Sequence, residues 1–215
     1  MSKQFWAVII AIILVFVGVY VSNSNKDKSA SSGPATATQH VMGSTANKVT
    51  LVEYGDFQCQ FCEQYEPTVA QVRDTYKDKV QFQFRNFPLR QIHRNALAGA
   101  RAAEAASLQG KFWEMHDALY AYSNWSVWTV SSSPSLEFEK YASTLGLNLD
   151  KFKTDFASSK VNDTINADIQ AGNALGITGT PSFFLNGKQV SPKPNVDDFK
   201  NLIDAELAKS QQPKS

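Results

Sequence analysis

The sequence is poor in the side chains that bind metals. Its 215 residues include only two cysteines and three histidines. A zinc site built on the cysteine pair would need two further ligands. The histidines, His40, His93 and His116, show no His-x-x-x-His spacing, and His40 falls in a segment that we expect to be a linker. We therefore expect no metal at the functional site, and the sequence leaves a structural metal elsewhere open.

Net charge is also nearly absent. The chain has 21 basic and 20 acidic residues, which gives a formal net charge of +1. A nucleic-acid surface needs a basic excess that this chain lacks, so nucleic acid is not an expected partner. Hydrophobic residues make up 43% of the chain and aromatic residues 12%, enough for a sizeable core. The length fits one domain with an appendage.

Charge is missing altogether from residues 5–21, which are strongly apolar. As a helix this segment would be roughly 25 Å long, at the lower limit for crossing a hydrocarbon core of about 30 Å. A cleaved signal peptide is the alternative. However, the apolar run exceeds the usual length of a signal-peptide core, and no good Ala-x-Ala site follows it. We expect an uncleaved, single-pass anchor at the cell membrane.

The anchor would be flanked by a short cytoplasmic end, residues 1–4, and by a flexible linker, residues 22–47, rich in Ser, Ala, Thr, Asn and Gly. The positive-inside rule barely decides the orientation, because Lys3 faces Lys26 and Lys28 across the apolar run. A domain with a cysteine pair behind such a segment fits an oxidising space. We therefore expect the domain on the extracytoplasmic side.

The two cysteines, Cys59 and Cys62, are spaced as Cys-x-x-Cys directly after the strand-like run 49–54. If a helix begins at the first cysteine, its unpaired N–H groups and its dipole stabilise the Cys59 thiolate. Cys62, one turn inside, stays a thiol. The pattern predicts a redox pair in which Cys59 is the nucleophile and Cys62 the resolving thiol. A purely structural disulfide is the alternative, but one this tight would constrain the unfolded chain little.

Periodicity predicts alternating helices and strands. Strands are expected at 48–54, 80–87, 180–185 and 188–190, and helices at 62–76, 94–108, 111–121, 135–145, 149–158, 161–175 and 197–209. The first three elements form a β-α-β unit with parallel strands, and Asn186-Gly187 suits a type I′ hairpin turn. The order predicts an α/β, thioredoxin-like fold over residues 48–210, with a helical insertion at about 91–175 and a tail at 211–215.

Three segments carry a family resemblance. They are Glu53 to Cys62, the insertion segment Phe112 to Asp117, and Gly176 to Gly187 before the hairpin. Together, at this spacing, they resemble the DsbA-like thiol:disulfide oxidoreductases, of the membrane-anchored bacterial kind. The resemblance covers about residues 48 to 209. It implies thiol:disulfide exchange in which Cys59 forms a mixed disulfide with a partner and Cys62 resolves it.

The resemblance also implies roles for residues outside the pair. The family places an acid at the position of Glu53 to exchange protons with Cys62; the alternative is a carboxylate that reaches solvent at the end of its strand. The family has a cis proline at the position of Pro181. Together with Thr180, which precedes it, this residue is expected to face the Cys59 sulfur.

Substrate is expected to contact Thr180, Phe57 and the two residues between the cysteines, Gln60 and Phe61. Gln60 and Phe61 lie where the redox potential is set in this family, and neither carries a charge or a proton to donate. The direction of electron flow therefore cannot be read from the pair. His93, His116 and Trp113 are assigned to core packing or helix capping.

The favoured function is the introduction of disulfide bonds into exported proteins that carry free thiols. No cofactor is expected, because the cysteines carry the electrons. The family implies reoxidation by a quinone-coupled thiol oxidase in the membrane. Two alternatives remain: a membrane-tethered reductase or isomerase, and a redox-inactive module that binds extended peptides.

Overall fold

The computed structural model describes residues 36–210. The expected anchor at residues 5–21 and the tail at 211–215 lie outside this range. Among the described residues, no helix combines the length and the apolar character needed to cross a membrane.

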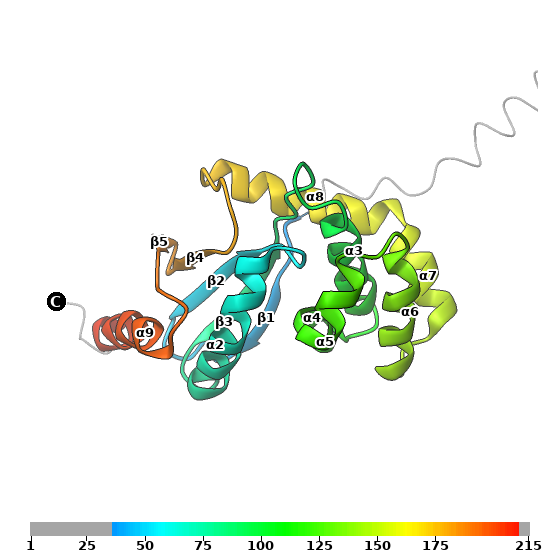
Figure 1. The fold of residues 1–215 in the computed structure, drawn as a ribbon. Coiled ribbons are helices and arrows are strands. Elements are labelled where there is room, and N and C mark those ends of the chain that lie inside the picture. Colours follow the sequence, from blue (N-terminus) through cyan, green and yellow to red (C-terminus); the bar gives the residue numbers. More distant parts are fainter. Residues whose placement is uncertain (1–35, 211–215) are drawn as a thin grey trace, which may run out of the picture. The chain divides into compact units, whose positions relative to one another are not determined.

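A five-stranded sheet forms the centre of the domain, in the order β1-β3-β2-β4-β5 (Figure 1). The strands are β1 (His40–Gly43), β2 (Thr50–Gly55), β3 (Gln81–Asn86), β4 (Ser182–Leu185) and β5 (Lys188–Val190). Strands β2 and β3 are parallel and are joined through helix α2 (Gln60–Tyr76), as predicted. Asn186 and Gly187 have positive φ angles of 48° and 78°, which agrees with the predicted type I′ turn.

The flexible linker expected at residues 22–47 is wrong in its last part, because strand β1 lies within it. The strand pairs antiparallel with the edge of β3, with His40 opposite Phe84. The Thr38 backbone N–H and hydroxyl donate to the buried Asp168 carboxylate at 2.7 and 2.6 Å. Four residues are too few for a readable alternation, and these partners lie far away in the sequence. The ordered domain therefore begins before residue 48.

Helices α2 and α9 (Val196–Ser210) share a core with one face of the sheet. Apolar residues of both helices pack on Leu51, Phe82 and Phe183. The alternation along β2 sends Leu51 and Glu53 to this face and Val52 and Tyr54 to the other. Glu53 therefore lies in the layer between the sheet and α2.

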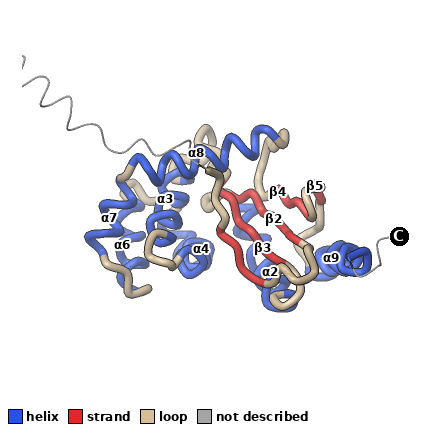
Figure 2. The backbone as a smooth tube through the Cα atoms, turned by 180° about the vertical axis from the view of Figure 1, so that it is seen from behind, coloured by secondary structure: helices blue, strands red, loops and turns tan. Residues whose placement is uncertain are grey.

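The insertion lies to one side of the sheet, with α9 at the opposite end (Figures 1 and 2). Its helices are α3 (Ala96–Ser107), α4 (Phe112–Tyr120), α5 (Tyr122–Trp128), α6 (Pro134–Thr144), α7 (Leu149–Ala157) and α8 (Ser159–Ala174). The alanine-rich α3 is largely buried in this unit, and a Cβ at Gly99 would lie 3.0 Å from the Phe57 Cβ. Helix α5 was not predicted, since it is short and aromatic rather than periodic.

Candidate active site

Cys59 lies directly before the first turn of α2, as the sequence predicts. It is the N-cap residue, with extended backbone angles, and α2 begins at Gln60. Its backbone N–H donates to the Asp56 carbonyl at 3.0 Å, which turns the chain from β2 into the helix. Both cysteines are free thiols in this structure. The side chain of Cys59 is 4% exposed and that of Cys62 is 1% exposed.

The two thiols differ in acidity. The pKa of Cys59 is lowered from 9.0 to about 6, chiefly because the Cys62 thiol donates a hydrogen bond to its sulfur. Burial opposes this, while the Thr180 side chain and the N–H groups of Phe61 and Cys62 help to lower the pKa. Near neutral pH Cys59 is therefore largely a thiolate.

Burial raises the pKa of Cys62 well above its ordinary value, and its hydrogen bond to Cys59 raises it further. The negative charges of Cys59 and Glu53 act in the same direction. Cys62 is therefore a protonated donor next to an ionised acceptor, which is the asymmetry expected from the position of the pair in the helix.

The loop before β4 reaches the Cys59 sulfur. The Thr180-Pro181 peptide bond is cis, as the family resemblance implies. Cys59 Sγ lies 3.4 Å from the Thr180 carbonyl oxygen and donates to it when Cys59 is protonated. The Thr180 hydroxyl is buried and has no hydrogen-bond partner within residues 36–210. A hydrogen bond from the Thr180 side chain helps to lower the pKa of Cys59, so the Cys59 thiolate is the acceptor for this hydroxyl.

Glu53 is buried beneath α2 and does not reach solvent at the end of its strand. It lies between Phe84 of β3 and Phe183 of β4 and is 6% exposed. Burial raises its pKa from 4.5 to about 8; repulsion from Glu66 adds to the shift and Arg73 offsets part of it. A carboxyl group that titrates this close to neutrality can both give and take a proton.

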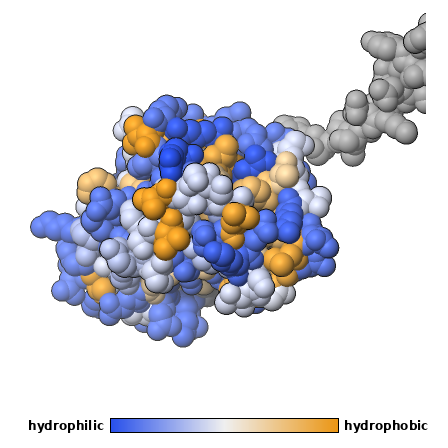
Figure 3. Space-filling model, turned by 45° about the vertical axis from the view of Figure 1, so that its right-hand side comes forward, coloured by the Kyte–Doolittle hydropathy of each residue, from blue (hydrophilic) through white to orange (hydrophobic). Residues whose placement is uncertain are grey.

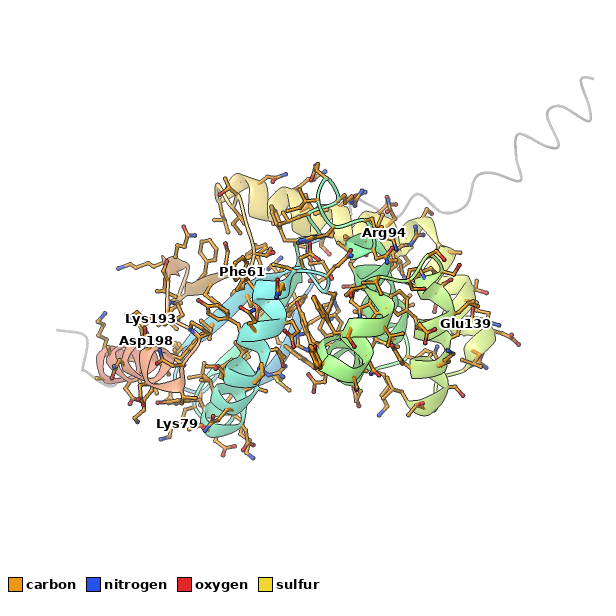
Figure 4. All side chains as sticks on the ribbon, viewed as in Figure 1. Phe61, Lys79, Arg94, Glu139, Lys193 and Asp198 are labelled. Atoms are coloured by element: carbon orange, nitrogen blue, oxygen red, sulfur yellow. The ribbon has the colours of Figure 1, made fainter. Side chains whose placement is uncertain are left out.

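The expected substrate contacts divide into two groups. Gln60 is exposed and Phe61 is 66% exposed, at the first turn of α2 (Figure 4). The expectation for Phe57 is wrong: its side chain is 1% exposed and packs against Phe84 and Tyr120. Phe57 lies two residues after β2, and its side chain packs into the core that the insertion helices form. The residues next to Phe57 in the sequence do not show that its side chain points inward.

Asp56 organises the loop before Cys59, a role that our sequence analysis missed. Its buried carboxylate accepts from the backbone N–H groups of Gln58 at 2.8 Å and Leu89 at 2.9 Å. Its second oxygen also lies 2.7 Å from Nδ1 of His93. An aspartate two residues before the N–H that it accepts is an Asx-turn pattern, and this local signal could have identified it.

Gln58 ties the same loop to the insertion. Its side-chain oxygen accepts from the Asn95 backbone at 2.6 Å, and its side-chain nitrogen donates to the Thr129 carbonyl at 2.9 Å. Val130, next to Thr129, is one of the exposed apolar side chains of this domain. On the face drawn in Figure 3, apolar side chains form separate patches within a largely hydrophilic surface.

Behind the cysteines, α2 and α4 carry a cluster of groups that could in principle bind a metal. Ligand atoms of Glu66, His116 and Asp117 lie within 4.8 Å of one another. The Arg73 guanidinium already binds both carboxylates, at 2.6 Å to Glu66 and 3.1 Å to Asp117, and it stacks over Trp113. A cation added here would meet this positive charge, so the cluster is an ion-pair network and we assign no metal to it.

This network also escaped our sequence analysis, although a signal was present. Cys62, Glu66, Val69 and Arg73 recur at helical spacing and share one face of α2. A helix face that packs into a core is normally apolar throughout. Two charged residues on this face therefore indicate buried ion pairs. The partners on α4 could not be found in this way, because no local pattern relates the two helices.

Comparison with known proteins agrees with this geometry. A family model described as thioredoxin matches residues 35–205. The probable disulfide bond formation protein D of Bacillus cereus is 32% identical over 183 residues, which cover 81% of this chain and 82% of the relative. A Na(+)/H(+) antiporter NhaA 3 of Salinispora tropica is 35% identical over 172 residues, which cover 80% of this chain. The chain spans only about a quarter of the antiporter's length.

Solved structures share the fold at lower identity. Alpha-DsbA1 from Wolbachia pipientis superposes with a TM-score of 0.70 at 22% identity, over 80% of this chain and 92% of that one. BdbD from Bacillus subtilis superposes with a TM-score of 0.66 at 20% identity, over 82% of this chain and all of that one. The chain therefore belongs to the thioredoxin family, together with the disulfide bond formation protein of Bacillus cereus, and it shares the fold of the DsbA structures.

Proposed function

We propose that this protein is a thiol:disulfide oxidoreductase that introduces disulfide bonds into proteins with free thiols. The observation that carries the proposal is the acidity difference across the pair, with the pKa of Cys59 lowered to about 6 and that of Cys62 raised. The name of the Bacillus cereus relative, a probable disulfide bond formation protein, points to the same activity.

The reaction begins with the Cys59-Cys62 disulfide. A substrate thiolate attacks Cys59 Sγ, the bond to Cys62 breaks, and Cys62 leaves as a thiolate that takes a proton from Glu53. A second substrate thiolate then attacks the substrate sulfur of the mixed disulfide, and Cys59 leaves as a thiolate. Two substrate thiols are oxidised and the protein disulfide is reduced. A low pKa makes Cys59 a good leaving group in the second step.

The partly exposed loop beside Cys59, before β4, is the proposed substrate site. The Thr180 carbonyl lies next to the reacting sulfur, and Pro181 follows it directly before β4. An extended substrate segment bound to this backbone would hold its sulfur against Cys59. Gln60 and Phe61 flank the same sulfur and would contact the substrate from α2.

The cellular setting completes the proposal. An anchor at residues 5–21 would hold the domain on the extracytoplasmic side of the cell membrane, where exported proteins carry free thiols. A quinone-coupled thiol oxidase in that membrane would reoxidise the cysteine pair. Fractionation of cells expressing the tagged full-length chain tests the anchor, since a cleaved, soluble product beginning after residue 21 contradicts it.

Oxidation of a reduced, unfolded disulfide protein is the direct test of the activity. The oxidised full-length protein should restore substrate activity, while Cys59→Ser and Cys62→Ser variants should not. The cysteine pair should also be largely reduced when equilibrated with glutathione buffers in which thioredoxin would be oxidised. A pair that stays oxidised in those buffers and readily reduces insulin would identify a reductase instead.

A further inference from the structure

A small cavity lies between the sheet, α2 and α4, behind the cysteine pair. Its polar lining includes Glu53 of β2, Arg73 of α2 and His116 of α4, and most of the remaining wall is apolar or aromatic. The space open to the centre of a water molecule measures about 10 Å³. A buried water needs roughly 10 to 15 Å³ on this measure and at least two polar partners. The cavity is therefore of the size and polarity that suits one water molecule.

Two groups at this cavity lack partners. Within residues 36–210, Arg73 Nη1 is buried and makes no hydrogen bond. The Glu53 carboxyl group is also buried, and no hydrogen bond is among the causes that shift its pKa. Burying a polar group without a hydrogen bond is unfavourable, because the group loses its bonds to water. A single water can accept from Arg73 and donate to Glu53, which satisfies both groups at once.

His116 connects the cavity to the surface. Its ring lines the cavity and is only 1% exposed. Its Nδ1 lies 2.9 Å from an oxygen of Asp117, whose side chain is 58% exposed. The second ring nitrogen, Nε2, is then the one left for a water in the cavity. An imidazole can receive a proton on one nitrogen and release another from the second.

Few other groups around Glu53 could carry a proton between it and solvent. Cys59, Cys62 and Glu66 face it from α2, together with Arg73, and Tyr120 faces it from α4. Arg73 cannot release a proton, and the pKa of Tyr120 is raised far above its ordinary value by burial. His116 is the cavity-lining group that can pass a proton on.

We propose that His116 relays protons between Glu53 and solvent, through one water in the cavity on its inner side and Asp117 on its outer side. The proposal rests on the proposed function, in which Glu53 gives a proton to Cys62. When the Cys62 thiolate takes that proton, the water protonates Glu53, His116 Nε2–H protonates the water, and Nδ1 takes a proton from solvent by way of Asp117. One proton enters for each protein disulfide reduced, because only the Cys62 thiolate takes up a proton and Cys59 stays a thiolate.

Reoxidation of the pair runs the relay outward. Cys62 gives its proton to Glu53, Glu53 gives one to the water, Nε2 accepts one from the water, and the Nδ1 proton leaves toward Asp117. The histidine thus alternates between its two neutral tautomers as the protein alternates between its redox states, and no rotation of the buried ring is needed. In the reduced protein the Nδ1–H form donates to Asp117, in accord with the 2.9 Å contact.

The test measures the rate at which the oxidised, full-length protein reacts with dithiothreitol, across pH and in both H2O and D2O. His116→Gln keeps a hydrogen-bonding side chain but cannot carry a proton through it. We expect a loss of roughly 100-fold in rate near neutral pH, the lower end of what positioned proton transfer contributes, and a larger solvent isotope effect. His40→Gln is the matched control, because His40 is also largely shielded from solvent, with its side chain 11% exposed, and pairs with a carboxylate, Glu104, but lies outside the cavity lining.

Two further variants distinguish the loss of proton transfer from a folding defect in His116→Gln. Asp117→Asn changes a largely exposed side chain and should slow the same step. In a Glu53→Gln background, His116→Gln should cause no further loss, because both residues serve one route. A wild-type rate and isotope effect in His116→Gln, or additive losses in the double variant, would overturn the relay. The glutathione equilibrium should be unchanged in His116→Gln, so failure of the relay is distinguishable from failure of the oxidase function.

Discussion

The Cys59 sulfur lies 3.4 Å from the carbonyl oxygen of Thr180, although 121 positions separate the two residues in the sequence. The contact joins the start of α2 to the loop before β4. Any group bonded to Cys59 must therefore lie against the backbone of this loop. The acidity of Cys59 is set in the same place, since Thr180 helps to lower its pKa.

Alkylation should distinguish the two cysteines. Because the pKa of Cys59 is about 6, its labelling rate in the reduced protein should stay high at neutral pH and fall as the pH drops through about 6. Cys62 should remain unlabelled over this range, because its pKa is raised and its side chain is buried. Peptide mass analysis after brief labelling measures both rates. Earlier labelling of Cys62 would reverse the assignment of nucleophile and resolving thiol.

The reduced form should gain stability over the oxidised form as the pH rises from about 6 to 9. The pKa of Cys59 is depressed by folding, so its contribution is complete above the ordinary value of 9.0 and is lost as the pH falls through about 6. The shift corresponds to about 4 kcal/mol at most. Thermal melts of both forms across this range give the difference. A gap between the two melting temperatures that is constant with pH would contradict the expectation.

Glu53→Gln should stabilise the protein at high pH and leave it unchanged at low pH. The pKa of Glu53 is raised by folding from 4.5 to about 8, so the native carboxyl costs nothing below pH 4.5 and the penalty grows until about pH 8. Amide replacement removes that penalty. Urea unfolding of wild type and variant at several pH values measures this destabilisation. Gln83→Glu is the contrasting variant: it adds a charge, so it should not stabilise the protein at high pH. If the free energies of unfolding of wild type and variant changed with pH in the same way, burial would not penalise the ionised form of Glu53.

Thr38→Val should destabilise the domain by about 1 to 3 kcal/mol, because it leaves the buried Asp168 carboxylate without one of its donors. Valine has nearly the same shape, so packing is little changed. Thr45→Val is the matched control, since Thr45 is exposed. The free energy of unfolding from denaturant titration gives both values. Equal stability of the two variants would mean that the hydrogen bond from the Thr38 hydroxyl to Asp168 adds nothing to the fold.

Much of the fold could be predicted from local patterns. A strand-like run identified β2, alternation identified β3, helical spacing identified α2, and the Asn186-Gly187 pair identified the hairpin turn. The position of Cys59 at the start of α2 followed from the same patterns, because a strand that ends five residues earlier leaves room only for a short turn. These features depend on backbone geometry and residue type within a few positions, which the sequence states directly.

Strand β1, the burial of Phe57 and the network around Glu53 could not be obtained in this way. β1 is held by the edge of β3 and by Asp168, and Phe57 is covered by the insertion. His116 reaches the cavity behind Cys62 only because α4 packs beside α2. The sequence by itself determined the reactive pair and the order of the elements other than β1 and α5. Tertiary structure alone decided the surroundings of that pair, because burial and long-range contacts set the pKa values and create the cavity.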